Sequence, residues 1–343
     1  MRLLTALALL LLALSPARAN DGFGGISATG LTFAQTDAVS MESEDLYISR
    51  DKVRVTYVFR NLTDRDVTGE IIFPLPPVRL AELMEFDWNL PIGADGGAAI
   101  NFTATVDGTD VPVNIDRIAV IAAPYDSATP ARAQYDSPGP DVTATLARYG
   151  IPVSLNVEEV MAVLDALDAA TLGELEDLGL VDYDPGYGST PLWSVVSRYH
   201  WTQTFPAGAE TEIRHAYDNA PAGGLFGWAH PPEDYMAEFA DLYCIDDGTS
   251  RALAKVLARK DDGGETYSLG TAYYLSYVLR TANSWAGPIK RFKLTLDKGD
   301  PGNIISLCVN GIKKTGPTTF VVEKTDYVPE RDLDILIVSP MPD

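Results

Sequence analysis

The stretch Lys52-Val-Arg-Val-Thr-Tyr-Val-Phe-Arg-Asn61 alternates apolar and polar side chains with a period of two. Successive side chains of a β-strand point to opposite faces, so Val53, Val55, Tyr57 and Phe59 share one face. The pattern predicts a strand with one buried face. The fold class is assigned from this strand outward, by asking which neighbouring segments have the same pattern.

The neighbouring sequence contains further strands and turns. Beyond the polar turn 61–66, the run Val67-Thr-Gly-Glu-Ile-Ile-Phe73 predicts a partner strand, which Pro74 ends because proline has no amide hydrogen to donate. Asp107-Gly108 between apolar runs predicts a second hairpin, and Asn310-Gly311 predicts a third. We therefore expect antiparallel sheets.

The period changes in the middle of the chain. Residues 122–140 are rich in Pro, Ala, Ser and Gly, and Asn156 can cap a helix whose apolar side chains face one way. Strand patterns return from residue 192. We predict a mainly β fold made of two antiparallel β-sandwich halves with a helical insertion between or within them. The expected parts are an N-terminal β-sandwich domain at 20–121, a loop and helical insertion at 122–190, and a C-terminal β-rich domain with helices at 191–343.

The N-terminus has the three parts of a secretory signal peptide. Arg2 supplies a positive charge, residues 3–14 are almost entirely Leu and Ala, and Ala17-Arg18-Ala19 is a small-x-small cleavage site. We predict a signal peptide at 1–19 and cleavage after Ala19, which places a soluble product in the periplasm or outside the cell. No later stretch approaches the ~20 apolar residues of a spanning helix, so no membrane span is expected after cleavage.

The composition is acidic. The chain has 26 Lys and Arg against 48 Asp and Glu, a net charge of −22. Such a surface repels phosphate backbones and no basic run offsets it, so nucleic acid is not an expected partner. The remaining classes of partner are a protein or an envelope glycan.

Two cysteines, Cys244 and Cys308, are present. An isolated pair in an oxidising compartment is more often a disulfide than a redox or metal site, and the spacing matches no C-x-x-C motif. We predict a Cys244–Cys308 disulfide. A catalytic cysteine is disfavoured because no activating base can be identified nearby in the sequence.

Histidines and acidic turns give the candidate metal sites. If residues 192–205 and 209–217 form a hairpin closed by Pro206 opposite Ala209, His200 lies directly across from His215. The two imidazoles could then share a divalent metal with Glu212 or Asp218. The alternative is a polar cross-strand pair. The acidic turn at 297–303 could bind Ca²⁺ but lacks the EF-hand spacing, so no cofactor is firmly predicted.

Aromatic side chains give the candidate binding residues. Trp193, Tyr199 and Trp201 occupy odd positions and share one strand face, and Trp285 follows another aromatic-rich strand. Flat rings with a polar edge suit sugar or protein contacts. Most rings of this kind belong to a β-sandwich core, so the binding strip is the alternative to a core role.

Several segments stand out together. They are Asn20-Asp-Gly-Phe-Gly-Gly25, Tyr57-Val-Phe-Arg-Asn61 with Phe73-Pro-Leu-Pro76, Tyr199-His-Trp-Thr-Gln-Thr-Phe-Pro-Ala207, Trp285-Ala-Gly-Pro-Ile289 and Ser306-Leu-Cys308. As a set they resemble the secreted bacterial domain-of-unknown-function family 4424 over nearly the whole mature chain. That resemblance implies export and no particular activity. The stretch 53–77 also resembles, faintly, the vault/inter-alpha-trypsin type of β-sandwich domain, which implies an extracellular interaction module.

The sequence contains no motif of nucleophilic or metal-dependent catalysis such as G-x-S-x-G, H-E-x-x-H or a P-loop. We therefore expect an exported, non-catalytic binding or interaction module for a protein or envelope glycan. The alternatives are an envelope hydrolase with carboxylate or metal chemistry and a periplasmic metal-binding protein. A hydrolase requires a deep cleft in which titratable groups converge.

Overall fold

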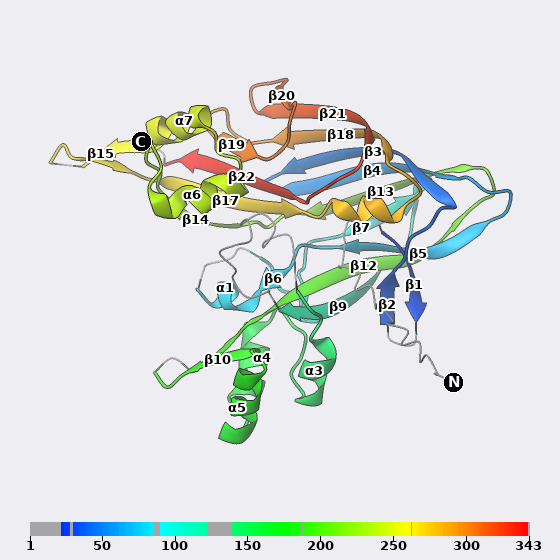
Figure 1. Cartoon of the computed structure of the whole chain (residues 1–343), viewed down its shortest axis with the longest axis horizontal. Coiled ribbons are helices and arrows are strands. Elements are labelled where there is room, and N and C mark those ends of the chain that lie inside the picture. The colour runs from blue at the N-terminus through cyan, green and yellow to red at the C-terminus, as the bar shows by residue number, and fades with distance from the viewer. Residues whose placement is uncertain are drawn as a thin grey trace, which may run out of the picture.

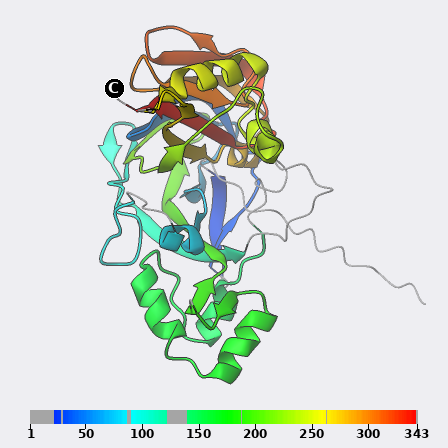
Figure 2. The ribbon, with the colours of Figure 1, turned by 90° about the vertical axis from the view of Figure 1, so that its left-hand side faces the viewer.

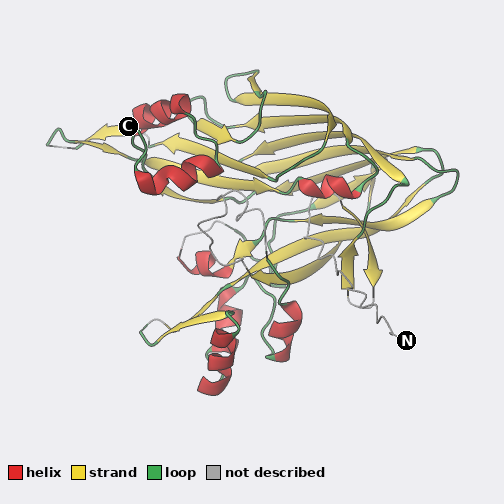
Figure 3. Ribbon diagram, viewed as in Figure 1, coloured by secondary structure: helices red, strands yellow, loops and turns green. Residues whose placement is uncertain are grey.

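The computed structural model describes residues 22–27, 30–85, 90–121, 139–186, 188–261 and 263–341. The predicted signal peptide at 1–19 lies outside these residues. The fold is mainly β, as predicted, with the strands gathered into several sheets (Figures 1 and 3). Within the described ranges, no helix has both the length and the hydropathy needed to cross a membrane.

The stretch that decides the fold is strand β4 of an eight-stranded sheet, which we call the large sheet. Its strand order is β20-β21-β18-β3-β4-β13-β7-β8, and β3 and β18 pair in parallel. The bounds are β3 (Val39–Ser49), β4 (Lys52–Asn61), β7 (Thr103–Val106), β8 (Thr109–Asp110), β13 (Glu210–Asp218), β18 (Ile289–Asp297), β20 (Lys313–Lys314) and β21 (Thr319–Tyr327).

Two further sheets pack on this one. The crossing sheet contains β1 (Gly22–Ser27), β2 (Gly30–Phe33), β5 (Val67–Pro74), β6 (Val78–Arg79), β9 (Asn114–Ile121) and β12 (Trp193–Phe205). The small sheet has the order β14-β17-β22-β19 and contains β14 (Ala222–Phe226), β17 (Gly270–Tyr277), β19 (Ile304–Leu307) and β22 (Leu333–Pro340). Two-stranded ribbons form from β10 (Val181–Asp184) with β11 (Gly188–Pro191) and from β15 (Ala258–Lys260) with β16 (Thr266–Ser268).

One continuous core lies between the large sheet and the other two. The large sheet contributes the predicted face of β4, namely Val53, Val55, Tyr57 and Phe59, all at most 2% exposed. The crossing sheet covers part of this face with side chains of β5 and β12, and the small sheet covers the rest with side chains of β17 and β22. The large sheet therefore joins the two smaller sheets through one hydrophobic core.

Helices pack in two places. In the insertion, α3 (Thr143–Arg148), α4 (Val157–Leu164) and α5 (Ala169–Asp177) lie at the bottom of Figure 2. Their side chains form a second core with α1 (Leu80–Glu85) and the first residues of β12. The side chain of Asn156 caps α4 as predicted, by accepting a hydrogen bond from the amide of Glu159. The other helices are η1 (Asp234–Met236), α6 (Ala237–Leu242), α7 (Asp247–Leu257) and η2 (Arg280–Ser284). Of these, α6 and α7 cover the outer face of the small sheet.

The predicted boundaries at residues 121 and 190 do not separate two sandwiches. Strands β3 and β4 come from the first half, yet they pair with β18 and β13 from the second half. Strands from both halves of the sequence therefore share the large sheet. The helical insertion does form, between two strands of the crossing sheet, β9 and β12.

The predicted hairpin of β4 with β5 is also absent. Strand β4 pairs with β13, with Tyr57 opposite Ile213, and β5 pairs with β12, with Phe73 opposite Tyr199. The connections β4–β5 and β12–β13 each cross from one sheet to another, and we call them the two arches. The hairpin at Asp107-Gly108 forms as predicted, with positive φ at both turn residues.

Asn61 holds the two arches together. Its side chain is 1% exposed, and its Nδ2 donates to the carbonyl oxygens of Arg65 at 2.8 Å and Phe205 at 2.9 Å. Its Oδ1 accepts from the amide of Thr63, and its own amide donates to the carbonyl oxygen of Ala209 at 3.0 Å. One buried side chain thus hydrogen-bonds to both connections, and β4 pairs with β3 on one side and with β13 on the other.

We expect Asn61→Ala to lower the free energy of unfolding by about 2–3 kcal/mol, because it leaves the buried carbonyl oxygen of Phe205 without this donor. Urea denaturation followed by tryptophan fluorescence measures this loss. The matched control is Asn114→Ala on an exposed position of β9, which should change stability by less than about 0.5 kcal/mol. Equal effects of the two substitutions would contradict the role of Asn61.

Candidate functional site

The two histidines of the predicted metal site lie apart. Strands β12 and β13 pair with different partners, so His200 is not opposite His215. His200 Nδ1 lies 3.0 Å from Glu70 Oε2, on the face of the crossing sheet that points away from the core containing Tyr199 and Trp201. The predicted register was wrong, and the shared metal site loses its geometric basis.

The carboxylates proposed as additional ligands are occupied by other contacts. Glu212 pairs with Arg214, and Asp218 pairs with Lys52 at 2.8 Å. In the acidic turn, Asp297 and Asp300 each accept a hydrogen bond from a turn amide. No group of three His, Cys, Asp or Glu side chains that could hold a metal ion occurs within the described ranges.

His215 lies inside the main core. Its ring is 5.2 Å from those of Phe73 and Trp201 and 5.4 Å from that of Phe102, measured between ring centres. Burial lowers the pKa of His215 to about 3, so the imidazole is neutral at neutral pH. His215 therefore packs as a neutral ring among the aromatic side chains of the core.

The four aromatic residues predicted as binding candidates are all buried. Trp193 belongs to the core of the helical insertion, while Tyr199, Trp201 and Trp285 belong to the main core, and each is at most 4% exposed. Burial raises the pKa of Tyr199 to about 12, and its ring stacks on that of Phe102 at 4.3 Å. Tyr199 also lines a hollow of about 270 Å³ next to Asp95. Trp193, Tyr199 and Trp201 share the face of β12 that points into a core, so β12 has no exposed strip of aromatic side chains.

One constellation that the sequence analysis did not identify joins His230, Ser250 and Asp247. Ser250 Oγ is 3.0 Å from His230 Nδ1, and His230 Nε2 is 3.7 Å from Asp247 Oδ1. Ser250 is 3% exposed and its Oγ also accepts a hydrogen bond from Trp228 Nε1 at 2.9 Å. A nucleophilic serine must reach its substrate, whereas this hydroxyl is buried beneath the indole. The cluster therefore fastens the 228–231 loop to α7.

A groove of about 810 Å³ lies between β19 and β21, and we call it the β19–β21 groove. Its lining mixes apolar and polar side chains and includes the disulfide and four charged residues. The lining residues are Cys244, Asp246, Thr249, Ile305, Ser306, Leu307, Cys308, Val309, Asn310, Ile312, Phe320, Lys324, Tyr327, Val328, Glu330 and Arg331.

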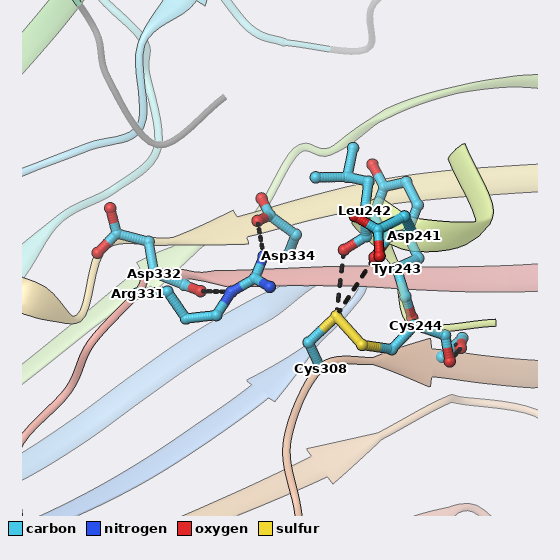
Figure 4. Close-up of a disulfide and its surroundings, with 9 residues drawn as sticks. Asp241, Leu242, Tyr243, Cys244, Cys308, Arg331, Asp332 and Asp334 are labelled. Atoms are coloured by element: carbon cyan, nitrogen blue, oxygen red, sulfur yellow. Dashed lines mark hydrogen bonds and ion pairs between the residues drawn. A yellow bond between two sulfur atoms is a disulfide. The ribbon is translucent and has the colours of Figure 1, made fainter. Parts of the chain in front are cut away.

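The disulfide between Cys244 and Cys308 forms one wall of this groove (Figure 4). It ties the end of β19 to the connection between α6 and α7, and Cys308 Sγ lies 3.3 Å from the carbonyl oxygen of Leu242. Beside it, Ser306 Oγ donates to the carbonyl oxygen of Tyr243 at 2.9 Å. The edge strand of the small sheet is thereby fixed to the helices.

The opposite wall is an open strand edge. Strand β20 pairs with β21 only at Val321 and Phe320, and the chain then turns away through residues 308–312. Within the described ranges, no strand pairs with the outer edge of residues 323–327. The predicted hairpin at Asn310-Gly311 was wrong, because β19 and β20 belong to different sheets. This departure of the chain from β21 creates both the groove and the open edge.

Charges lie at one end of the groove. Arg331 pairs with Asp334 at 3.2 Å, and Arg280 pairs with Asp332 at 3.0 Å. Burial and the nearby Glu44 and Glu330 raise the pKa of Tyr327, which Arg331 partly opposes. The groove thus combines apolar and charged side chains with an open backbone edge. The sequence analysis missed it because its lining residues come from separate segments.

We expect stability to fall between pH 7.5 and pH 5 in a way that depends on His215. The unfolded imidazole takes up a proton below its usual pKa of about 6.5, whereas the folded one does so only near pH 3. The unfolded state therefore gains about 2 kcal/mol relative to the folded state over this interval. Urea denaturation across pH should show this slope flattened in His215→Phe and retained in His230→Ala. A slope unchanged by His215→Phe contradicts the buried neutral imidazole.

We expect Cys244→Ser with Cys308→Ser to destabilise the protein by about 4 kcal/mol, because the disulfide closes a loop of 64 residues. Thermal unfolding with and without reductant measures this difference. The wild-type protein should lose the same amount on reduction, and the double variant should not respond. Indifference of the wild-type protein to reduction would contradict the prediction.

Comparison with known proteins identifies a family that spans most of the chain. A family model described as a domain of unknown function, DUF4424, matches residues 19–336. No curated protein matches the sequence. Among solved structures, a Legionella pneumophila protein provisionally described as nutrient binding is similar, at 16% identity and a TM-score of 0.44. The alignment covers 93% of this chain and 72% of that one. Since the family model spans nearly the full sequence, the protein belongs to the DUF4424 family, as its motifs predicted.

Proposed function

We propose that this protein is an exported, non-catalytic binding module and that the β19–β21 groove receives a polypeptide partner. The observation that carries the proposal is the coincidence of the groove with the open edge at residues 323–327. An open edge offers backbone donors and acceptors, and a groove beside it offers a place for side chains. Together these are the parts of a peptide-binding site.

The charged groups of the groove favour binding over catalysis. Asp246 Oδ1 accepts the amide of Thr249 as the cap of α7, and Arg331 is paired with Asp334. The large shifts in pKa belong to His215, Tyr199 and Tyr217, none of which lines the groove. A hydrolytic site brings shifted titratable groups together in its cleft. The groove does not have that arrangement within the described ranges.

A polypeptide fits the groove better than a glycan. Sugars are commonly held on exposed faces of aromatic rings, and the aromatic candidates Trp193, Tyr199, Trp201 and Trp285 are buried. A strand edge instead recognises another backbone. The predicted leader and the disulfide both suit an oxidising compartment, so the partner is expected outside the cytoplasm.

Photo-crosslinking in exporting cells tests this function. We expect p-benzoylphenylalanine in place of Ile312, in the groove, to give an adduct with a polypeptide. The same group in place of Leu225, which is 77% exposed on β14 and outside the groove, should give none. The adduct at position 312 should disappear when Val309→Trp fills the groove.

Three outcomes would contradict the proposal. They are equal adducts at positions 312 and 225, an adduct that survives Val309→Trp, and an adduct with carbohydrate in place of polypeptide. Turnover of an ester or polysaccharide panel by the purified protein, abolished by Val309→Trp, would instead support the hydrolase alternative.

A further inference from the structure

We propose that the partner segment is an extended, acidic peptide that adds as an antiparallel strand to the open edge of β21, in line with β20. This inference rests on the proposed function and specifies the chemistry of the same groove. Three features of the described residues support it: the backbone edge, the apolar side chains among the groove lining and an unusual distribution of lysines.

The unpaired backbone edge of β21 favours the addition of a strand. Lys313 opposite Val321 and Lys314 opposite Phe320 are the whole pairing of β20 with β21. Beyond them, the edge of residues 323–327 has no strand partner in the part of the chain that the structure describes. Strand addition satisfies such a row of amides and carbonyls, and the register of β20 sets the direction of the incoming chain.

The apolar residues of the groove favour a peptide with apolar side chains at alternate positions. Val309 and Ile312 on one side and Tyr327 on the other border the space that an added strand would overlie. Every second side chain of that strand points to the same face. The peptide should therefore carry apolar residues at alternate positions across its centre.

The distribution of the lysine residues favours an acidic peptide. The chain has nine lysines, and six of them lie on or between the strands of this edge of the large sheet, in a molecule of net charge −22. These six are Lys290, Lys293, Lys298, Lys313, Lys314 and Lys324.

Several of the six are already neutralised or held. Lys290 pairs with Asp326 and Lys293 pairs with Asp45, while Lys298 donates to backbone carbonyl oxygens of its own turn. The remaining lysines are the ones nearest the open edge.

Lys313, Lys314 and Lys324 have no carboxylate within ion-pairing distance among the described side chains. Lys324 Nζ lies 4.5 Å from the centre of the Tyr327 ring and Lys314 Nζ lies 6.0 Å from that of Phe320, so both are placed over the groove wall. A second copy of the same edge would bring lysine against lysine, which disfavours self-pairing. Of the acids nearby, Asp246 caps α7 and Asp326 pairs with Lys290, which leaves Glu323 and Glu330 beside the three lysines. An acidic peptide would pair with these lysines.

Fluorescence anisotropy with labelled synthetic peptides tests this inference on the full mature protein. The probe is Glu-Glu-Val-Thr-Val-Thr-Val-Glu-Glu. One comparison peptide replaces each Glu by Lys, and another carries N-methyl groups on alternate central amides. At 0.15 M salt we expect the acidic probe to bind about tenfold more tightly than the lysine version, since three weak charge pairs sum to roughly that factor. The N-methylated probe should not bind.

Charge reversal at the edge gives the matched protein variants. Lys314→Glu with Lys324→Glu should reverse the preference between the acidic and lysine peptides. Lys260→Glu, an exposed change of the same charge on β15, should leave it unchanged.

Failure of this inference can be told apart from failure of the proposed function. Equal or tighter binding of the lysine peptide overturns the acidic partner, and binding of the N-methylated peptide overturns strand addition. Absence of binding by every probe overturns both parts of the inference. In each case the crosslink at position 312 and its loss in Val309→Trp still decide whether the groove binds a polypeptide.

Discussion

The structure depends on the buried amide of Asn61, which bonds the two arches to each other. Because Asn61 Nδ2 reaches both Arg65 and Phe205, the connections β4–β5 and β12–β13 lie side by side. Strand β4 must then pair with β13, and β5 with β12. The two sheets grow from these pairs in opposite layers, and residues from both halves of the sequence end in one core. The chain is therefore a single interleaved β structure.

The candidate site follows from this interleaving. Strand β3 pairs in parallel with β18, which carries the large sheet outward to β21. The small sheet ends at β19, whose far end the disulfide fixes to the helices. At this border β20 pairs only with the first part of β21. The rest of the outer edge of β21 therefore has no partner strand among the described residues. The groove and the open edge are consequences of how the sheets end.

Local patterns in the sequence predicted the strands and their buried faces. The alternation in β4 identified its core face, Asp107-Gly108 identified a true hairpin, and Asn156 identified a helix cap. Pairing was predicted less well. A short polar connection can close a hairpin or an arch, and only the contacts of Asn61 with the second connection, far away in sequence, decide between them. For the same reason the metal geometry of His200 and His215 was wrong. The groove escaped prediction because its lining comes from several segments, although the concentration of lysines in 290–324 was visible in the sequence.

The central claim is that the edge of β21 at residues 323–327 is open in the free protein and is closed by a polypeptide. Amide hydrogen exchange resolved by residue measures this directly. The amides of 323–327 that point away from β18 should exchange rapidly in the free protein and slowly when the crosslinking partner is bound, while those of β3 and β4 should not change. Slow exchange at this edge in the free protein, or no slowing on binding, would contradict the account.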